Sequence, residues 1–427
     1  FQRLYDVARS VLRTEDDVRR LVLEAAQDDV RDGGRWLEIQ VDPSGYAARF
    51  GGITAFTDLV LDAVADASAT PCREARGTRD RQPQGLGLMG NHASIEGLPK
   101  AHLHLHFTGS MRHTTLLELA ERDGHHLPDA LVEDWPPRLS GADEKGWFRF
   151  QRLYDVARSV LRLEEDVRRL VREAAEDDKR DGSRWLEIQV DPSGYAARFG
   201  GATAFTDLVL DAVRESSRDV GIGMAVVIAA NRTRHPLDAR TLARLAAQYV
   251  GRGVVGFGLS NDERRGSTRD FAPAFRIAEQ AGLLLTPHGG ELLGPDSARV
   301  CVEELRADRL GHGIRAVEDP DLLDLIVSRG IALEVCPVSN VALGVYSDLS
   351  SVPLPELMAA GATIALGSDD PLLFGSRLAG QYATMRAAHE LTDVQLADLA
   401  RSSIRASRAA EDDKSTWLGE IDEWLGQ

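Results

Sequence analysis

Short runs of apolar and β-branched residues alternate with amphipathic segments from residue 101 to the C-terminus. Eight such runs predict strands at 101–107, 185–190, 223–230, 254–260, 283–289, 309–314, 332–338 and 363–370. Between them, apolar residues at helical spacing predict helices, for example at 163–178, 238–249, 271–281, 319–328 and 354–360. Strands that alternate with helices favour a parallel sheet covered by helices.

Eight strand–helix units predict the α/β class and, within it, a closed (β/α)8 TIM barrel. An open doubly wound sheet is the alternative, but no glycine-rich phosphate turn follows the first predicted strand. Side chains that carry chemistry in such a barrel should therefore lie at the C-terminal ends of the strands, where barrel active sites are built.

The N-terminal part of the chain repeats a later part. Residues 1–64 match residues 150–213 at 57 of 64 positions, with a constant offset of 149. A barrel has one place for its second strand, so the copies 36–41 and 185–190 compete for it. We expect the second copy to build a barrel over 89–427. Residues 1–88 are then a partial duplicate plus a disordered linker, outside the barrel and without a domain of their own; a regulatory extension is the alternative.

Charge and cysteine content narrow the choice of partners. The chain has 427 residues, of which 43% are hydrophobic, and a formal net charge of −17. An acidic surface repels phosphate backbones and anionic lipid, so we expect neither nucleic acid nor membrane as a partner. Three cysteines, Cys72, Cys301 and Cys336, show no C-x-x-C spacing, which predicts a cytoplasmic location. The sequence leaves the oligomeric state open.

Two histidines at the end of the first predicted strand indicate a metal site. His104 and His106 are two residues apart, so their side chains point to the same face of the strand. Two neighbouring imidazoles in a barrel interior are best satisfied by a shared cation, and zinc is the usual one. His102 has the same parity but lies deeper, and we interpret it as a hydrogen-bonded core residue.

Further candidate residues follow the ends of three other predicted strands. His288 ends the fifth strand, and Glu291 lies three residues further on in the sequence Pro-His-Gly-Gly-Glu, a position beside a candidate metal ligand that favours a role in proton transfer. His312 lies between two glycines at the end of the sixth strand. Asp369 and Asp370 end the eighth strand, and because adjacent strand residues face opposite ways, they should have different tasks.

The ordered motifs resemble the signature of the adenosine deaminase family from about residue 98 onward. They are Leu-Pro-Lys-Ala-His-Leu-His-Leu-His at 98–106, His-Gly-Gly-Glu at 288–291, Leu-Gly-His-Gly at 310–313, Cys-Pro-Val-Ser-Asn at 336–340 and Ser-Asp-Asp-Pro at 368–371. The resemblance implies that Zn²⁺ is bound by His104, His106, His288 and Asp369. It also implies that Glu291, His312 and Asp370 are catalytic.

Two departures from the family pattern concern substrate recognition. The family has an Asp that engages the sugar two residues after the second zinc histidine, where this chain has Thr108. The family's glycine at the purine edge is Asn261 here, within the stretch Gly-Leu-Ser-Asn-Asp-Glu at 258–263. The resemblance thus implies substrate contacts at Thr108, Asn261, Gly258 and Gly290, with the ribose contact in doubt.

The activity implied by the resemblance is hydrolytic deamination at purine C6, with hydroxide generated at the zinc. Zinc lowers the pKa of bound water to about 7. His312 and Asp370 would orient and deprotonate that water, and Glu291 would protonate ring N1. The substrate would be a small purine: adenosine, or else adenine or a modified aminopurine. Other hydrolase classes, and an inactive or binding-only protein misassembled through the duplication, are the remaining alternatives.

Overall fold

A computed structural model describes residues 14–31, 46–47, 49–69, 94–141 and 143–426. These residues separate into two compact units, Phe1–Met89 and Gly90–Gln427.

The larger unit contains eight parallel strands that pair in sequence order, from β1 next to β2 through to β7 next to β8. The strands are β1 Lys100–His106, β2 Ser183–Val190, β3 Gly223–Asn231, β4 Val254–Ser260, β5 Leu284–Gly289, β6 Arg309–His312, β7 Ala332–Val335 and β8 Thr363–Leu366. All eight predicted strands are present, and the first five agree with the prediction to within two residues at each end. The (β/α)8 barrel is confirmed.

The last three strands are shorter than predicted, because the backbone turns away where functional residues follow. β6 ends at His312, whose φ of 63° lies in the left-handed region. Pro337 starts a helix soon after the end of β7 at Val335. After β8 ends at Leu366, Asp369 has a φ of 61°. Left-handed φ values do not continue a strand, so these side chains are re-aimed at the strand ends.

Asp369 closes the barrel through its backbone. Its N–H donates to the carbonyl of His104 at 3.1 Å, and its carbonyl accepts from the N–H of His106 at 2.9 Å. An isolated parallel bridge between Leu105 and Asp369 results, and it joins the last strand segment to β1. The backbone that completes the barrel therefore also fixes the position of the Asp369 carboxylate.

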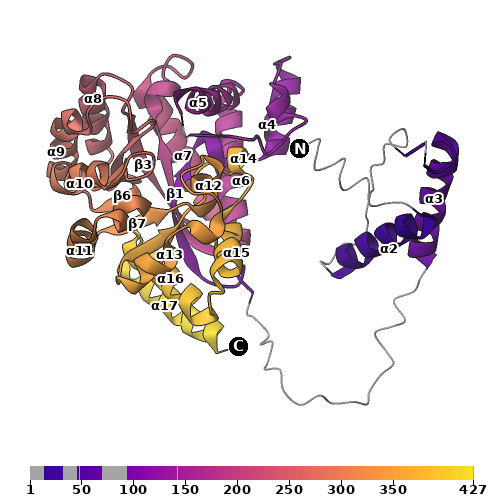
Figure 1. The fold of residues 1–427 in the computed structure, drawn as a ribbon. Coiled ribbons are helices and arrows are strands. Elements are labelled where there is room, and N and C mark those ends of the chain that lie inside the picture. Colours follow the sequence, from indigo (N-terminus) through magenta and orange to yellow (C-terminus); the bar gives the residue numbers. More distant parts are fainter. Residues whose placement is uncertain (1–13, 32–45, 48, 70–93, 142, 427) are drawn as a thin grey trace, which may run out of the picture. The chain divides into compact units, whose positions relative to one another are not determined.

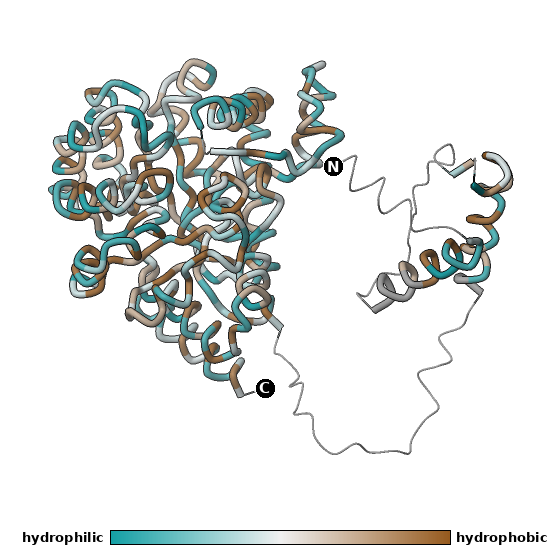
Figure 2. The backbone as a smooth tube through the Cα atoms, viewed as in Figure 1, coloured by the Kyte–Doolittle hydropathy of each residue, from teal (hydrophilic) through white to brown (hydrophobic). Residues whose placement is uncertain are grey.

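Helices surround the strands (Figure 1). They are α4 His113–Arg122, α5 Glu144–Ser159, α6 Glu164–Arg180, α7 Ala202–Val220, α8 Pro236–Ala247, α9 Ala272–Gln280, α10 Pro295–Glu303, α11 Pro320–Arg329, α12 Pro337–Ala342, α13 Leu354–Ala359, α14 Pro371–Phe374, α15 Leu378–His389, α16 Asp393–Ala406 and α17 Glu411–Leu425. The alternation of apolar and polar stretches along them can be followed in Figure 2. In the part of the chain that the structure describes, none is both long and apolar enough to cross a bilayer.

The amphipathic pattern that predicted the helices is the pattern that buries them. In α6, for example, Val167, Leu170, Val171 and Ala174 recur at helical spacing and all are fully buried. The acidic residues Glu164, Glu165 and Asp166 occupy its first turn, where the helix dipole favours negative charge.

Buried polar residues support the strands below the site. His102 is almost fully buried, donates through Nδ1 to Asp178 at 2.9 Å and accepts the Ser368 N–H through Nε2 at 3.1 Å. Both ring nitrogens are thus satisfied within the protein, which confirms that His102 is a core residue. Arg309 is also buried, and it pairs with Glu187 on one side and with Glu334 on the other.

The N-terminal unit contains α2 Glu15–Arg31 and α3 Ile53–Ala69. A small cluster of Val18, Phe56, Leu59 and Val60 lies between them. Tyr46 stacks on Phe56 with ring centroids 4.4 Å apart, as its counterpart Tyr195 stacks on Phe205 at 4.2 Å in the barrel. The first copy thus reproduces a local contact of the second. The predicted strand at 36–41 and nearly all of the predicted linker lie outside the described residues.

Candidate active site

The candidate metal ligands His104, His106, His288 and Asp369 come from three strand ends, and the candidate catalytic residue His312 comes from a fourth. His104 and His106 lie on β1, His288 on β5, His312 on β6, and Asp369 follows β8. The possible ligand atoms of His104, His106 and His288 lie within 4.8 Å of one another, and so do those of His104, His312 and Asp369. Oδ1 of Asp369 lies 3.2 Å from Nε2 of His106 and 3.7 Å from Nε2 of His104. The structure brings together all the residues that the sequence predicts as ligands.

Three observations show that this cluster fits a cation. Nε2 of His104 is buried and has no hydrogen-bond partner among the described residues. A Cβ at Gly311 would lie 2.6 Å from Cδ2 of His288 and 3.1 Å from Cε1 of His104, so this glycine makes room for both rings. Although burial opposes it, the carboxylates of Asp370 and Asp369 raise the pKa of His106 to about 9. Three imidazoles and a carboxylate form a donor set suited to zinc.

Buried polar side chains orient the imidazoles. Nδ1 of His104 lies 2.8 Å from Oε2 of Glu334. The amide of Gln189, on β2, lies between two rings, with Nε2 at 3.4 Å from Nδ1 of His104 and Oε1 at 3.2 Å from Nε2 of His288. Such partners set the tautomer and direction of metal-binding histidines. The sequence reasoning missed both Glu334 and Gln189.

Glu291 is presented by a loop that another carboxylate organises. Glu263 accepts from the backbone N–H groups of Gly290, Glu291, Leu292 and Leu293 at 2.6–2.9 Å. It also accepts from the Ser297 hydroxyl at 2.8 Å. The loop after β5 is therefore wrapped around one buried carboxylate, and the backbone carrying Glu291 is held in place.

Burial keeps Glu291 in its acid form. Desolvation, reinforced by the nearby carboxylates of Asp369 and Glu263, raises the pKa of Glu291 well above its ordinary value. The Oε1 atom of Glu291 lies 3.6 Å from Nε2 of His312. A protonated carboxyl group in a closed site can donate a proton to a ring nitrogen.

His312 and Asp370 face the same site with contrasting proton affinities. Burial lowers the pKa of His312 to about 3, so its imidazole is neutral. Burial and the charge of Asp369 raise the pKa of Asp370 to about 8. Oδ1 of Asp370 is buried without a hydrogen-bond partner among the described residues, and a Cβ at Gly109 would come within 1.8 Å of it. Asp370 thus has a free oxygen of raised basicity.

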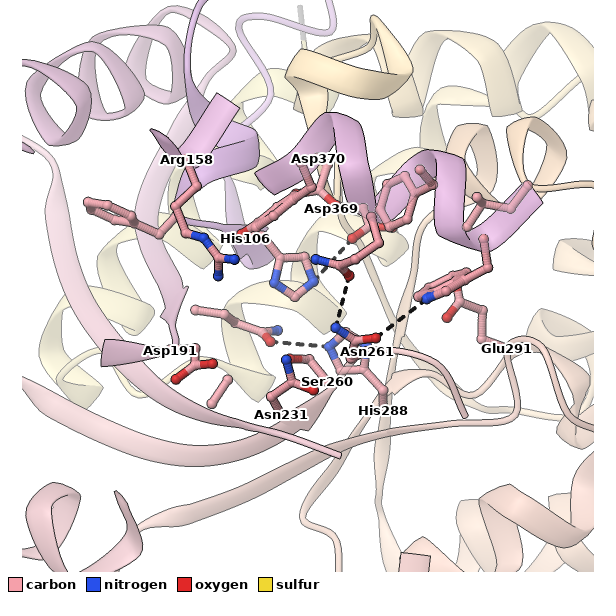
Figure 3. Close-up of a pocket in the computed structure, with 18 of the residues that line it drawn as sticks. His106, Arg158, Asp191, Asn231, Ser260, Asn261, His288, Glu291, Asp369 and Asp370 are labelled. Carbon is pink, nitrogen blue, oxygen red and sulfur yellow. Dashed lines mark hydrogen bonds and ion pairs between the residues drawn. The ribbon is translucent and has the colours of Figure 1, made fainter. Parts of the chain in front are cut away.

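A pocket opens over these groups (Figure 3). One wall is helix α5, whose pocket-lining residues are Trp147, Phe150, Gln151, Tyr154 and Arg158. Successive members of this set are mostly three or four residues apart, which places them on one face of the helix. The opposite parts of the lining come from the strand ends, including Gln189, Asp191, Asn231 and Ser260.

The four predicted substrate contacts differ in their placement. Asn261 lines the pocket, whereas Thr108, Gly258 and Gly290 are not among its lining residues. Thr108 is fully buried, and its hydroxyl shares a hydrogen bond with the hydroxyl of Tyr195. Gly258 lies within β4, where a Cβ would lie 3.2 Å from the carbonyl oxygen of Thr286. Gly290 has a φ of 72° and donates its N–H to Glu263.

Asn261 connects the end of β4 to helix α5. Its Nδ2 donates to Oε1 of Gln151 at 2.9 Å, and its Oδ1 accepts from Nε1 of Trp147 at 3.4 Å. Its φ of 81° is unusual for a residue other than glycine. The residue that replaces the family's glycine therefore ties the pocket wall to the barrel.

Comparison with known proteins agrees with this arrangement. A family model described as adenosine deaminase matches residues 1–79 and 99–424. A protein named adenosine/adenine deaminase from Streptomyces virginiae is 62% identical over 328 residues, which cover 77% of this chain and 97% of the relative. An aminodeoxyfutalosine deaminase from Streptomyces avermitilis is 35% identical, over 82% of this chain and 96% of the relative.

The fold is shared with a solved structure of an adenine deaminase from Arthrobacter aurescens. The two superpose with a TM-score of 0.71 at 29% identity, over 77% of this chain and 100% of the other. The shared part leaves about a quarter of this chain unmatched, as expected if the barrel is the common unit.

Proposed function

The chain belongs to the adenosine deaminase family and is an aminohydrolase of aminopurines, and we propose that it converts adenosine, or a related 6-aminopurine compound, to the 6-oxo product and ammonia. The observation that carries the proposal is that two functional groups lie at the same pocket. One is a three-histidine and one-aspartate cluster suited to a metal ion, and the other is a buried carboxyl group at Glu291.

His104, His106, His288 and Asp369 would hold a zinc ion. A zinc ion bound there supplies Lewis-acid chemistry, which lowers the pKa of a water molecule to about 7. Glu334 and Gln189 keep the imidazoles aimed at that point.

The remaining residues move protons and position the substrate. Glu291, held in its acid form, donates a proton to ring N1, which makes C6 more electrophilic. Oδ1 of Asp370, which has no hydrogen-bond partner among the described residues, is the proposed acceptor of a proton from the attacking water, and the neutral imidazole of His312 orients that water. C6 gains an oxygen and loses its amino group as ammonia, so a water molecule and an aminopurine become a 6-oxopurine and ammonia.

Free adenine is the second candidate substrate. Relatives from Chelativorans and Mesorhizobium, 33% and 32% identical, are named adenine deaminases. A small-molecule purine is the partner in either case. We also propose a cytoplasmic location, which rests on the odd number of cysteines without C-x-x-C spacing.

Ammonia release tests the reaction. Purified protein is assayed with adenosine, 2′-deoxyadenosine and adenine, while metal content is measured on the same sample. We expect a stoichiometric amount of zinc and turnover of at least one of these compounds. His104→Ala should lose metal and activity together, whereas His126→Ala, at an exposed position, should keep both. Folded protein with zinc but without ammonia release from any aminopurine contradicts the proposal.

A further inference from the structure

We propose that Asp191 and Arg158 form a subsite for a hydroxyl-bearing substituent on the imidazole side of the purine. This inference rests on the proposed function and deepens it, because it selects a nucleoside-like substrate over the free base. The two residues would take over sugar recognition from position 108, where the family pattern has an acidic residue and this chain has Thr108.

Thr108 is not available for the sugar. Its side chain is fully buried, and it does not line the pocket. Its hydroxyl is already engaged with the hydroxyl of Tyr195, which is also buried. Any polar contact to a substituent at this end of the pocket must therefore come from other residues.

Asp191 brings a carboxylate to the same end of the pocket. It follows directly on β2 and lines the pocket. Its Oδ1 accepts from the backbone N–H of Ser193 at 2.9 Å and from the Ser193 hydroxyl at 2.6 Å. Among the described residues, none donates to Oδ2. The turn after β2 thus fixes the carboxylate by one oxygen and leaves the other as an acceptor.

Arg158 brings hydrogen-bond donors from the opposite wall. It lies in the last turn of α5, and its Nη2 bonds to Asp155 one turn earlier on the helix. A Cβ at Gly194 would lie 2.6 Å from Nη1 of Arg158, so the absence of a side chain there makes room for the guanidinium. Arg158 and Asp191 both line the pocket, yet they form no ion pair within 4.0 Å in the described structure.

The two groups together select the chemistry of the ligand. A carboxylate only accepts hydrogen bonds and a guanidinium only donates them, whereas a hydroxyl group can do both. Because the two charges are opposite, a neutral substituent with hydroxyl groups matches the pair. A phosphate or carboxylate would gain from Arg158 but would be repelled by Asp191.

The position of Asp191 and Arg158 agrees with the orientation of the purine that the proposed reaction requires. In the view of Figure 3, Arg158 and Asp191 lie on one side of His106, and Glu291 lies on the other. A purine that presents C6 to the histidine cluster and N1 to Glu291 turns its imidazole ring away from Glu291. A substituent at N9 then extends toward Asp191 and Arg158.

The test compares kcat/KM for adenosine and adenine in the full-length protein and in variants. For Asp191→Ala and for Arg158→Met, we expect the loss with adenosine to exceed the loss with adenine by tenfold or more. Asp211→Asn is the matched control, since Asp211 is partly exposed and pairs with Arg214 on the same helix, α7. The ratio of kcat/KM for adenosine to that for adenine should equal the ratio in the unmutated protein. Equal losses on both substrates in the two pocket variants overturn the proposal.

Equilibrium binding of inosine and hypoxanthine gives a readout that needs no turnover. The unmutated protein should bind inosine more tightly, and Asp191→Ala should remove most of that difference. If no aminopurine is deaminated but this difference is found, the proposed function fails and the subsite stands. AMP is the third ligand: if AMP is turned over more efficiently than adenosine and Arg158→Met abolishes that advantage, the site serves an anion and the proposal is wrong.

Discussion

Glu334 accepts a hydrogen bond from His104, with Nδ1 and Oε2 2.8 Å apart. Both side chains are completely buried, and the other carboxylate oxygen of Glu334 lies 2.8 Å from Nε of Arg309. Although burial works to raise it, the charge of Arg309 and the hydrogen bond with His104 hold the pKa of Glu334 below its ordinary value. The charged carboxylate requires the proton of His104 on Nδ1, so Nε2 is left free to bind a metal ion.

The first prediction concerns this pair. Glu334→Gln should lower zinc affinity by about 10–100-fold, because partners of metal-binding histidines typically contribute that much. Zinc affinity is measured by competition with a chelator in folded protein. Glu303→Gln, on the surface pair with Arg299, is the matched control and should leave zinc affinity unchanged. Unchanged affinity in Glu334→Gln would show that His104 is oriented by its packing alone.

The second prediction concerns the proton donor. Glu291→Gln should keep zinc but lower kcat by about 10²–10⁴-fold, because a positioned acid is lost while the proposed metal ligands remain. The amide retains a similar shape, and the backbone at 291 stays anchored to Glu263. Zinc content and kcat are measured on the same preparation. A variant with near-normal kcat would mean that N1 receives its proton from another group.

The third prediction uses a glycine at the metal site. In Gly311→Ala the new methyl group would lie 2.6 Å from Cδ2 of His288, so the ring must move and zinc should be lost. Overpacking of this kind typically costs about 1–3 kcal/mol of stability. Gly419→Ala, where no atom lies within 4 Å, should bind zinc normally and be slightly more stable. Full zinc content in both variants would contradict the close packing of these rings.

The fourth prediction concerns the link between Asn261 and α5. Asn261→Gly relieves the left-handed backbone but removes the bonds to Gln151 and Trp147, each worth about 0.5–1.5 kcal/mol. Amide hydrogen exchange within Glu144–Ser159 should become faster, while the melting temperature changes little. Gln151→Ala removes one of the same bonds without altering the backbone and should act in the same direction. Unaltered exchange in both variants would show that α5 is held by its other contacts.

The fifth prediction concerns the duplicated segment. A chain shortened to begin at Met89 should retain zinc and deaminase activity, because the second copy already supplies β2, which pairs with β1 and β3. Solubility, zinc content and kcat are compared with those of the full chain. Loss of activity in the shortened, folded protein would make the first copy a working part of the enzyme.

The sequence by itself was sufficient for the order of the eight strands and for the chemistry at their ends. Apolar alternation and helical spacing are local properties, so they can be seen in any stretch of the chain. His104 and His106 lie on one face because of strand periodicity alone. The identities of His288, His312 and Asp369 also follow from short motifs, and the structure brings them together at one rim.

Only the tertiary structure revealed the contacts between residues far apart in the chain. The bond from His104 to Glu334 spans 230 positions, and the four bonds that anchor the loop of Glu291 end on Glu263, in a different loop. Likewise, the burial of Thr108 depends on Tyr195, and the unpaired oxygen of Asp191 is seen only when its neighbours are placed. Local patterns carry periodicity and side-chain chemistry, but the partner of a buried polar group is decided by packing between distant segments.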